Sequence, residues 1–340
     1  MKKILVAMSG GVDSTCTAYF LKQDGFLVEG AYMKLHNKPN YHEANIKKVK
    51  KAASFLNIPY HVIDFSNKFD DFVFDPFIQS YKDGLTPNPC IMCNRNIKFG
   101  ALIEFAKEKG FDALATGHYA NIEDGFITEA IDKSKDQSYF LSNIKKENLD
   151  FMMFPLGKKY KKDIKAFAST IDFLKEFATQ KESSEICFVE NSYLEILEQK
   201  LKIDMPGDVL NQDGEIIGKH KGYMHYTIGQ RKGFTLFVAH DPHYVLKIDS
   251  KTNTIVVGKK DELNIYNFKI KDLNLFFDPK DKFESHVKIR YAGAKTPCLV
   301  KLHDNNLATV ELYEKLQGLA PGQSAVFYDE NRVIASGIII

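Results

Sequence analysis

The loop Ser9-Gly10-Gly11-Val12-Asp13-Ser14 constrains the fold of this chain more than any other feature. An apolar run over residues 4–8 precedes it, and a helical pattern follows it as far as Leu21. Short continuous apolar runs are typical of strands buried on both faces. Glycines let a backbone approach an anion closely, and the amides of the following helix N-terminus point toward it. The pattern therefore predicts a strand, a phosphate-binding loop and a helix, the opening unit of a parallel α/β sheet.

Alternating strand and helix patterns continue through the first half of the chain. Strand-like runs cover residues 27–33, 60–65 and 113–116, and helical patterns cover residues 44–56 and 97–109. Repeated β-then-α order predicts a doubly wound parallel sheet, and ligands of such sheets bind at the carboxyl ends of the strands.

The second half of the chain has a different, β-rich pattern. Asp213-Gly214 is a strong hairpin signal. From residue 268 onward, short strands typical of a small β-barrel or sandwich follow one another. They are expected over residues 287–291, 298–302, 308–312, 324–328 and 332–339. We therefore predict three domains, which cover residues 1–200, 201–265 and 266–340.

The composition is that of an ordinary soluble protein. Of the 340 residues, 44% are hydrophobic and 26% are charged, and the formal net charge of +2 does not by itself indicate a nucleic-acid partner. We expect no membrane segment, because no apolar run approaches the length that spans a bilayer. The densest lysine cluster is best interpreted as a solvated helix face. It consists of Lys158, Lys159, Lys161, Lys162 and Lys165.

The cysteines are few, odd in number and scattered, which argues against a secreted disulfide scaffold. They are Cys16, Cys90, Cys93, Cys187 and Cys298. We therefore predict a cytoplasmic protein, in which a cysteine matters as a thiol, a persulfide or a metal ligand.

The phosphate loop also indicates which chemistry to expect. It lacks the Lys-Ser/Thr ending of the Walker motif, so transfer of the γ-phosphoryl group is not expected. Ser9 and Ser14 supply hydroxyl donors. Bare phosphate would repel Asp13, which favours a Mg²⁺ ion between this carboxylate and a pyrophosphate group. The alternative is a Gly-Gly turn with an Asp and Ser helix cap that binds no ligand.

Two cysteines lie in the segment Thr86-Pro87-Asn88-Pro89-Cys90-Ile91-Met92-Cys93-Asn94. Its two prolines and Asn88 predict a rigid loop that could hold a thiol beside the nucleotide. CxxC spacing also suits zinc or a redox pair, although a structural zinc site normally needs four ligands and no second pair at ligand spacing follows. Cys187 stands alone after Ser183-Ser184-Glu185-Ile186, and spacing alone favours a buried strand cysteine there.

The phosphate loop resembles that of the PP-loop ATP pyrophosphatases, and over nearly its whole length the chain resembles the bacterial tRNA 2-thiouridylases. Several separate sequence segments match this family, in the same order along the chain. After the loop and the Thr86 to Asn94 segment come Ala115-Thr116-Gly117-His118-Tyr119-Ala120, Lys135-Asp136-Gln137-Ser138-Tyr139-Phe140-Leu141, Ile186-Cys187-Phe188, His225-Tyr226-Thr227-Ile228-Gly229-Gln230-Arg231-Lys232-Gly233, Arg290-Tyr291 and Pro321-Gly322-Gln323-Ser324-Ala325-Val326-Phe327.

The resemblance implies an enzyme that inserts sulfur at the wobble uridine of tRNA, position 34, with ATP and a nucleotide-bound Mg²⁺. It implies that Cys187 carries a persulfide, received from a cysteine desulfurase or a sulfur-relay protein, and that Cys93 is a second nucleophile. Both thiols are then expected in polar, partly exposed surroundings. Some members carry Asp at the position of Cys90, so no catalytic role is assigned to Cys90.

The resemblance also implies two sets of binding residues. The ATP contacts are Ala7, Met8, Ser9, Gly10, Gly11, Val12, Asp13, Ser14, Met33 and Gly117. The RNA contacts are His118, Lys135, Asp136, Gln137, Arg290, Tyr291 and Gln323. Two alternatives stay open: another PP-loop ligase or amidotransferase with a small substrate, and a non-enzymatic zinc-bearing RNA-binding protein that uses Cys90 and Cys93.

Overall fold

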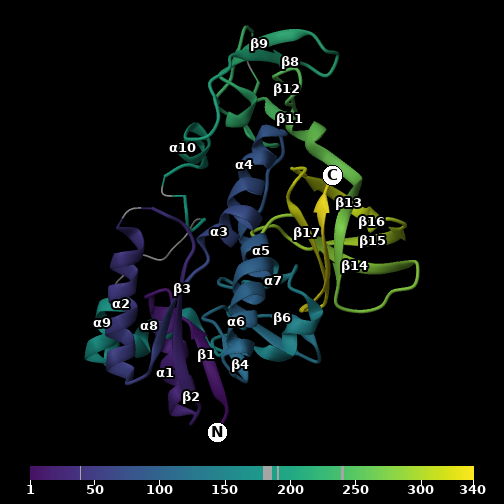
Figure 1. Cartoon of the computed structure of the whole chain (residues 1–340). Helices are drawn as coiled ribbons and strands as arrows, with labels where there is room; N and C mark the ends of the chain where they lie inside the picture. The colour runs from purple at the N-terminus through teal and green to yellow at the C-terminus, as the bar shows by residue number, and fades with distance from the viewer. Residues whose placement is uncertain (39, 179–185, 190, 239–240) are drawn as a thin grey trace.

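The computed structural model describes residues 1–38, 40–178, 186–189, 191–238 and 241–340 (Figure 1). Within these residues, the N-terminal sheet has the strand order β3-β2-β1-β4-β7, and all of its neighbouring strands are parallel. Its strands are β1 (Lys3–Ala7), β2 (Leu27–Lys34), β3 (Tyr60–Asp64), β4 (Ala113–Ala115) and β7 (Met152–Met153). The predicted doubly wound parallel sheet is confirmed.

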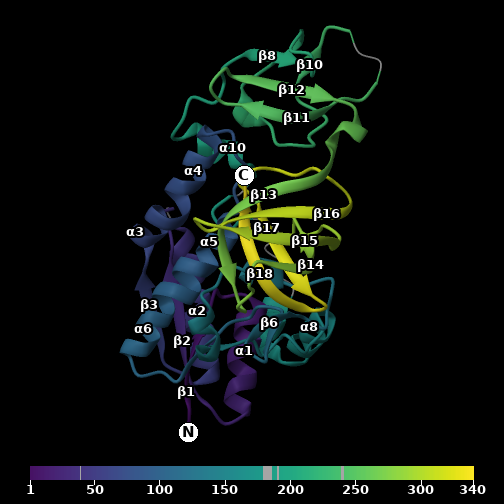
Figure 2. The ribbon, with the colours of Figure 1, turned by 90° about the vertical axis from the view of Figure 1, so that its right-hand side faces the viewer.

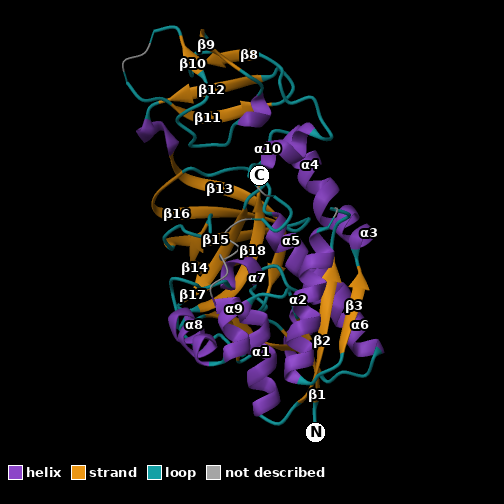
Figure 3. Ribbon diagram, turned by 90° about the vertical axis from the view of Figure 1, so that its left-hand side faces the viewer, coloured by secondary structure: helices purple, strands orange, loops and turns teal. Residues whose placement is uncertain are grey.

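Alternate side chains of β1 enter different cores, because successive residues of a strand point to opposite faces of the sheet. Ile4 and Val6 join one cluster, whereas Leu5 joins another. The first face is covered by α1 (Val12–Gln23), α2 (Tyr41–Leu56), α8 (Lys161–Thr170) and α9 (Asp172–Ala178). The second is covered by α6 (Leu102–Glu108) and the helical run before it, which begins with α5 (Pro89–Cys93). Helices α3 (Ser66–Phe69) and α4 (Asp75–Lys82) pack in the same core but lie beyond the carboxyl ends of the strands, toward the central part of the chain (Figure 3).

The helix predicted over residues 97–109 is the end of a longer helical run that begins at Pro89. Helix α5 continues through a π-helical stretch, Asn94–Ala101, into α6, with a kink at Phe99. The remaining short helical segments are α7 (Ser138–Leu141), α10 (Tyr193–Glu198), the π-helical turn Asp70–Phe74 and the 3₁₀ turns Lys146–Phe151, Tyr223–His225 and Lys260–Leu263. Among the described residues, no helix is long and apolar enough to cross a membrane.

The central part of the chain forms a second sheet, with the order β10-β9-β8-β12-β11 (Figure 2, top). The predicted hairpin at Asp213-Gly214 is confirmed, since β8 and β9 pair antiparallel around it and Gly214 has a φ of +85°. The strands are β8 (Gly207–Leu210), β9 (Ile216–His220), β10 (Thr235–Leu236), β11 (Tyr244–Asp249) and β12 (Thr254–Gly258).

The C-terminal strands close into a barrel, because β13 at one end of the order β13-β16-β15-β14-β17-β18 also pairs with β18 at the other (Figure 2). They are β13 (Asn264–Leu275), β14 (Lys282–Lys288), β15 (Thr296–His303), β16 (Leu307–Gln317), β17 (Ser324–Asp329) and β18 (Arg332–Ile339). The N-terminal hairpin of β5 (Ala120–Glu123) and β6 (Phe126–Glu129) extends this sheet through β18.

Two expectations for single segments are wrong. The strand predicted over residues 287–291 ends at Lys288, and a turn closed by the Gly293 amide on the Arg290 carbonyl (3.0 Å) takes Arg290 and Tyr291 out of the sheet. Cys187 is exposed in a turn rather than buried in a strand. Its neighbour Phe188 is the buried residue, packed against Phe69, Phe74 and Phe77. Ser183, Ser184 and Glu185 lie outside the described residues.

Candidate active site

The glycines of the phosphate loop allow it to pack closely against neighbouring residues of the chain. Gly10 has a φ of +81°, and a Cβ there would lie 2.9 Å from the Lys48 Cβ. The Ser9 amide donates to the Ser14 Oγ (3.2 Å), which in turn donates to the Gly11 carbonyl (3.1 Å). Helix α1 then begins at Val12, so its first amides face the concave side of the loop. This backbone geometry fits an anionic phosphate group.

Strand ends surround the loop at the carboxyl edge of the sheet. Ala7 ends β1, and the following Met8 is buried, with its amide bonded to the Ala31 carbonyl (2.8 Å). Met33 is partly buried near the end of β2. Gly117 follows β4, and a Cβ there would come within 3.0 Å of both Asp13 and the Ser14 amide nitrogen. The glycine therefore lets the chain after β4 pack directly against the phosphate loop.

The Asp13 carboxylate was expected to face a Mg²⁺ ion, but in the structure it is bound by two protein side chains. The Lys161 ammonium lies 2.6 Å from both Asp13 carboxylate oxygens, and the Tyr119 hydroxyl donates to one of them (3.0 Å). Lys161 is buried at the start of α8, so its assignment to a solvated helix face is wrong. A tertiary ion pair between α1 and α8 overrides the local lysine pattern. In this arrangement Asp13 is paired with a protein cation.

Three thiols form one electrostatic cluster. Cys90 and Cys93 are three residues apart on α5 and so share a helix face. The Cys187 thiol interacts electrostatically with both of them, although Cys187 is 94 residues beyond Cys93 in the sequence. Lys98 lowers the pKa of each of the three thiols. The charges of the predicted catalytic pair Cys93 and Cys187 therefore influence each other in the folded chain, and Cys90 and Lys98 take part in the same interaction.

The surroundings of the two predicted nucleophiles differ. Cys93 is 5% exposed, and burial raises the pKa of its thiol to about 12, so its expected partial exposure is wrong for this state. It packs in the core because α5 lies against the second face of the sheet. Cys187 is exposed. Desolvation of the Cys187 thiol by the surrounding protein still raises its pKa, and the positive charge of Lys98 opposes this rise. Among the described residues, no group of three or more His, Cys, Asp or Glu is placed to hold a metal ion.

Two electrostatic interactions link the thiols to residues near the phosphate loop. Lys98, which acts on the thiols, also acts on His118, a residue adjacent to Gly117. On the other side, Tyr32 of β2 interacts with Cys187 and is hydrogen-bonded by Asn45, whose carbonyl faces Gly10. Sequence reasoning assigned no role to Lys98 and interpreted Lys161 as part of a solvated helix face. The only indication in the sequence is that each of these two lysines lies close to a segment shared with the family or to the start of a helix.

His118 and the segment of Lys135, Asp136 and Gln137 hold local structure. The His118 ring contacts Phe99 and Phe154 and bonds to Thr116, and its desolvation holds the pKa well below the ordinary value. Asp136 is 6% exposed and accepts from Ala130 and Ser138. Gln137 accepts from the Tyr119 amide (2.9 Å). Lys135 is half-exposed beside them.

The predicted RNA contacts of the C-terminal barrel pack against three other segments of the chain. The Gln323 side-chain amide donates to the carbonyls of Thr86 and Pro87 (3.0 and 3.2 Å). The Tyr291 ring packs on Phe140, with centroids 4.7 Å apart, and remains 38% exposed. Arg290 donates to the carbonyls of Ile228 and Gly318, which joins the central segment to the barrel. Gln323 and Arg290 therefore hold the barrel against other parts of the chain, and Tyr291 keeps part of its ring exposed.

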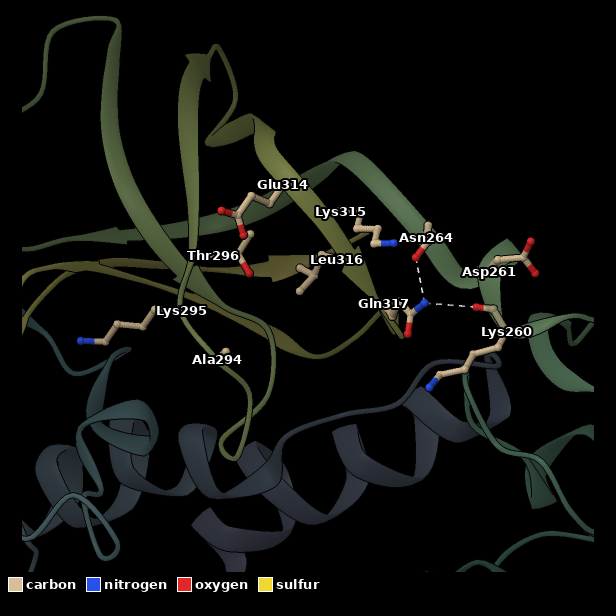
Figure 4. A pocket seen from close by; sticks show the side chains of 10 residues that line it. All are labelled: Lys260, Asp261, Asn264, Ala294, Lys295, Thr296, Glu314, Lys315, Leu316 and Gln317. Carbon is tan, nitrogen blue, oxygen red and sulfur yellow. Dashed lines mark hydrogen bonds between the residues drawn. The ribbon is translucent and has the colours of Figure 1, made fainter.

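A polar pocket of about 770 Å³ lies elsewhere, between the start of β13, the end of β16 and the loop before β15 (Figure 4). On its wall, Gln317 bonds to Asn264 and to the Lys260 carbonyl. None of the residues predicted for ATP, sulfur or RNA lines this pocket.

We expect alkylation to distinguish the thiols. At neutral pH, iodoacetamide should label Cys187 first, whereas Cys93 should react only slowly because it is buried. Only the thiolate reacts, and the pKa of Cys187 is raised, so its labelling rate should keep rising beyond the ordinary thiol pKa of about 8.5. Peptide mass spectrometry across a pH series measures both rates. Faster labelling of Cys93 than of Cys187 in folded protein would contradict this geometry.

Comparisons with known proteins cover nearly the whole chain. Three family models match in succession: a tRNA methyl transferase HUP domain over residues 2–191, a tRNA methyl transferase PRC-barrel domain over residues 195–259 and an aminomethyltransferase beta-barrel domain over residues 266–339. The tRNA-specific 2-thiouridylase MnmA of Campylobacter jejuni (strain 81116) is 58% identical over 99% of both chains, and that of Campylobacter lari is 59% identical over the same shares. The chain belongs to the tRNA-specific 2-thiouridylase family.

Similarity of this 2-thiouridylase family member to solved structures is partial. A 4-thiouridine synthetase–RNA complex with bound ATP is 20% identical, covers 58% of this chain and 50% of its own, and has a TM-score of 0.38. The NH3-dependent NAD synthetase of Campylobacter jejuni is 21% identical, covers 53% and 69%, and has a TM-score of 0.33. Family membership thus rests on the full-length sequence relatives.

Proposed function

We propose that this protein is an ATP-dependent tRNA-uridine 2-sulfurtransferase that acts on the wobble uridine, position 34. The observation that carries the proposal is the combination of a loop whose geometry fits a phosphate group with two thiols, Cys93 and Cys187, whose charges influence each other. The full-length relatives of this chain are named tRNA-specific 2-thiouridylases. A loop for pyrophosphate and a pair of thiols are the two components that activation and sulfur insertion require.

The 2-carbonyl of uracil is a poor electrophile, so its oxygen must first become a leaving group. In the proposed reaction this oxygen attacks the α-phosphorus of ATP and pyrophosphate leaves. The amides around Gly10 and Gly11 bind the phosphates. Mg²⁺ that arrives with the nucleotide supplies further charge neutralisation.

Sulfur transfer then uses the two thiols. Cys187 receives a terminal sulfur from a cysteine desulfurase or relay protein and becomes a persulfide. This sulfur attacks C2 of the activated base, and AMP leaves. The Cys93 thiolate attacks the remaining Cys187 sulfur, which releases 2-thiouridine and forms a Cys93–Cys187 disulfide. An external thiol reductant must supply two electrons to restore both thiols. Since Cys93 is buried in this state, its attack requires local opening of α5 or the Cys187 turn.

The test is incubation of the protein with ATP, Mg²⁺, unmodified tRNA, a cysteine desulfurase with cysteine as the persulfide donor, and a thiol reductant. We expect 2-thiouridine at position 34, with AMP and pyrophosphate formed in equal amounts. Because two family models carry a tRNA methyl transferase description, a parallel incubation contains S-adenosylmethionine with a labelled methyl group. Methylated tRNA without thiolation would replace the proposal by methyl transfer. Pyrophosphate release stimulated by a small molecule instead of tRNA would favour another PP-loop ligase.

Tyr291 allows the RNA part of the proposal to be tested. We infer that its exposed ring stacks on a nucleotide base, and such stacking contributes about 1–3 kcal/mol. We expect Tyr291→Ala to weaken tRNA binding by roughly tenfold while ATP binding is unchanged. Tyr313→Ala on β16 is the matched control, since that tyrosine is also exposed and is not among the predicted contacts. Equal tRNA affinity of the two variants, measured by filter binding, would remove Tyr291 from the interface.

A further inference from the structure

The pair formed by Lys161 and Asp13 joins residues 148 positions apart. Both Asp13 carboxylate oxygens lie 2.6 Å from the Lys161 ammonium. The Lys161 side chain is 8% exposed, whereas that of Asp13 is 32% exposed. The carboxylate therefore faces the solvent side of the phosphate loop, and the lysine supports it from the protein interior.

The place of Lys161 is unfavourable for a lysine in three respects. Its ammonium is withdrawn from water, which costs free energy even when the charge is paired. It occupies the first position of α8, where the positive end of the helix dipole disfavours a cation. Its neighbours Lys158, Lys159 and Lys162 add positive charge. Fold stability alone therefore does not account for a lysine at this position.

The surrounding contacts hold this lysine in place. Its backbone amide donates to the Asp132 carboxylate (3.0 Å), which fixes the start of α8. The Tyr119 ring lies 5.6 Å from its ammonium, and the hydroxyl of the same tyrosine donates to Asp13. Tyr119 is in turn held by Gln137. Asp13 is thus fixed by two donors on different segments of the chain.

We propose that Lys161 is a positioning residue for the ATP-dependent step, a role that rests on the proposed function. It orients Asp13 beside the phosphate loop and offsets the negative charge that would otherwise repel the triphosphate. Without it, an uncompensated carboxylate would lie within one residue of the amides that bind the phosphates. The effect acts through Asp13, so it should disappear when Asp13 no longer carries a charge.

The test is a double-mutant cycle that measures the dissociation constant for ATP with Mg²⁺, in the absence of tRNA. Lys161→Met should weaken ATP binding by about tenfold or more, the size expected for loss of a charge-assisted contact. Asp13→Asn combined with Lys161→Met should bind ATP no more weakly than Asp13→Asn alone. Additive losses would mean that Lys161 contacts the nucleotide independently, and unchanged binding by Lys161→Met would also overturn the proposal.

Controls separate this role from a purely structural one. Lys162→Met removes an exposed lysine from the same helical turn and should leave ATP binding unchanged. Thermal unfolding monitors the fold of each variant. If Lys161→Met does not fold, Lys161→Gln, which keeps a polar side chain, is measured in its place. A structural role alone would lower the melting temperature while the folded fraction binds ATP with wild-type affinity. Failure of the wild-type protein to thiolate tRNA would refute the proposed function and still leave the ATP-binding cycle interpretable.

Discussion

Cys187→Ser should abolish tRNA thiolation, with a loss on the order of a thousandfold or more. A serine hydroxyl cannot accept a persulfide sulfur, and Cys187 is the exposed thiol of the cluster that a protein sulfur donor can reach. Because its side chain is outside the core, the fold should be retained. The measurements are the 2-thiouridine content of tRNA, persulfide labelling of the protein, and the affinities for ATP and tRNA, both of which should be unchanged.

The matched control for this variant is Cys90→Ser. It removes a thiol of the same cluster, on the same helix face as Cys93, and has no assigned role in the reaction. We expect this protein to keep thiolation activity. Thiolation by Cys187→Ser at the wild-type rate would exclude Cys187 from the mechanism. Loss of activity in Cys90→Ser alone would move the sulfur-carrying role to Cys90.

Gly117→Ala should lower the affinity for ATP by about 100-fold, the scale of a misplaced binding geometry. Its new Cβ would lie 3.0 Å from the Cβ and carbonyl carbon of Asp13 and from the Ser14 amide nitrogen. Two of these three are backbone atoms, so no side-chain rotation can relieve the contact. The phosphate loop must shift, and its amides then no longer converge on one anion. Isothermal titration with ATP and Mg²⁺ measures the change.

Gly110→Ala is the control for the cost of replacing a glycine. Gly110 has a φ of +71° and no neighbour within 4 Å of its added Cβ, so alanine there introduces backbone strain without touching the loop. It should lower the melting temperature and leave ATP affinity unchanged. If both variants bind ATP as well as the wild type, the close packing of Gly117 does not determine the geometry of the loop.

Local patterns in the sequence were sufficient for the framework of this protein. The apolar run before Ser9 predicted β1, the glycines predicted the loop, and Asp213-Gly214 predicted a hairpin. Such features depend on neighbours within a few residues, since side-chain period and turn chemistry are local properties. The several matching words in order indicated the 2-thiouridylase family, which the full-length relatives confirm.

Only the tertiary structure decided which distant residues meet. It paired Lys161 with Asp13, although the local lysine pattern favoured a solvated face. It exposed Cys187 in a turn, where its charge influences the thiols of α5, while the neighbouring Phe188 filled the core. It also buried Asp136, a predicted RNA contact, in a hydrogen-bonded turn. The physical reason is that burial and ion pairing depend on where the chain returns after many residues, which composition and periodicity do not encode.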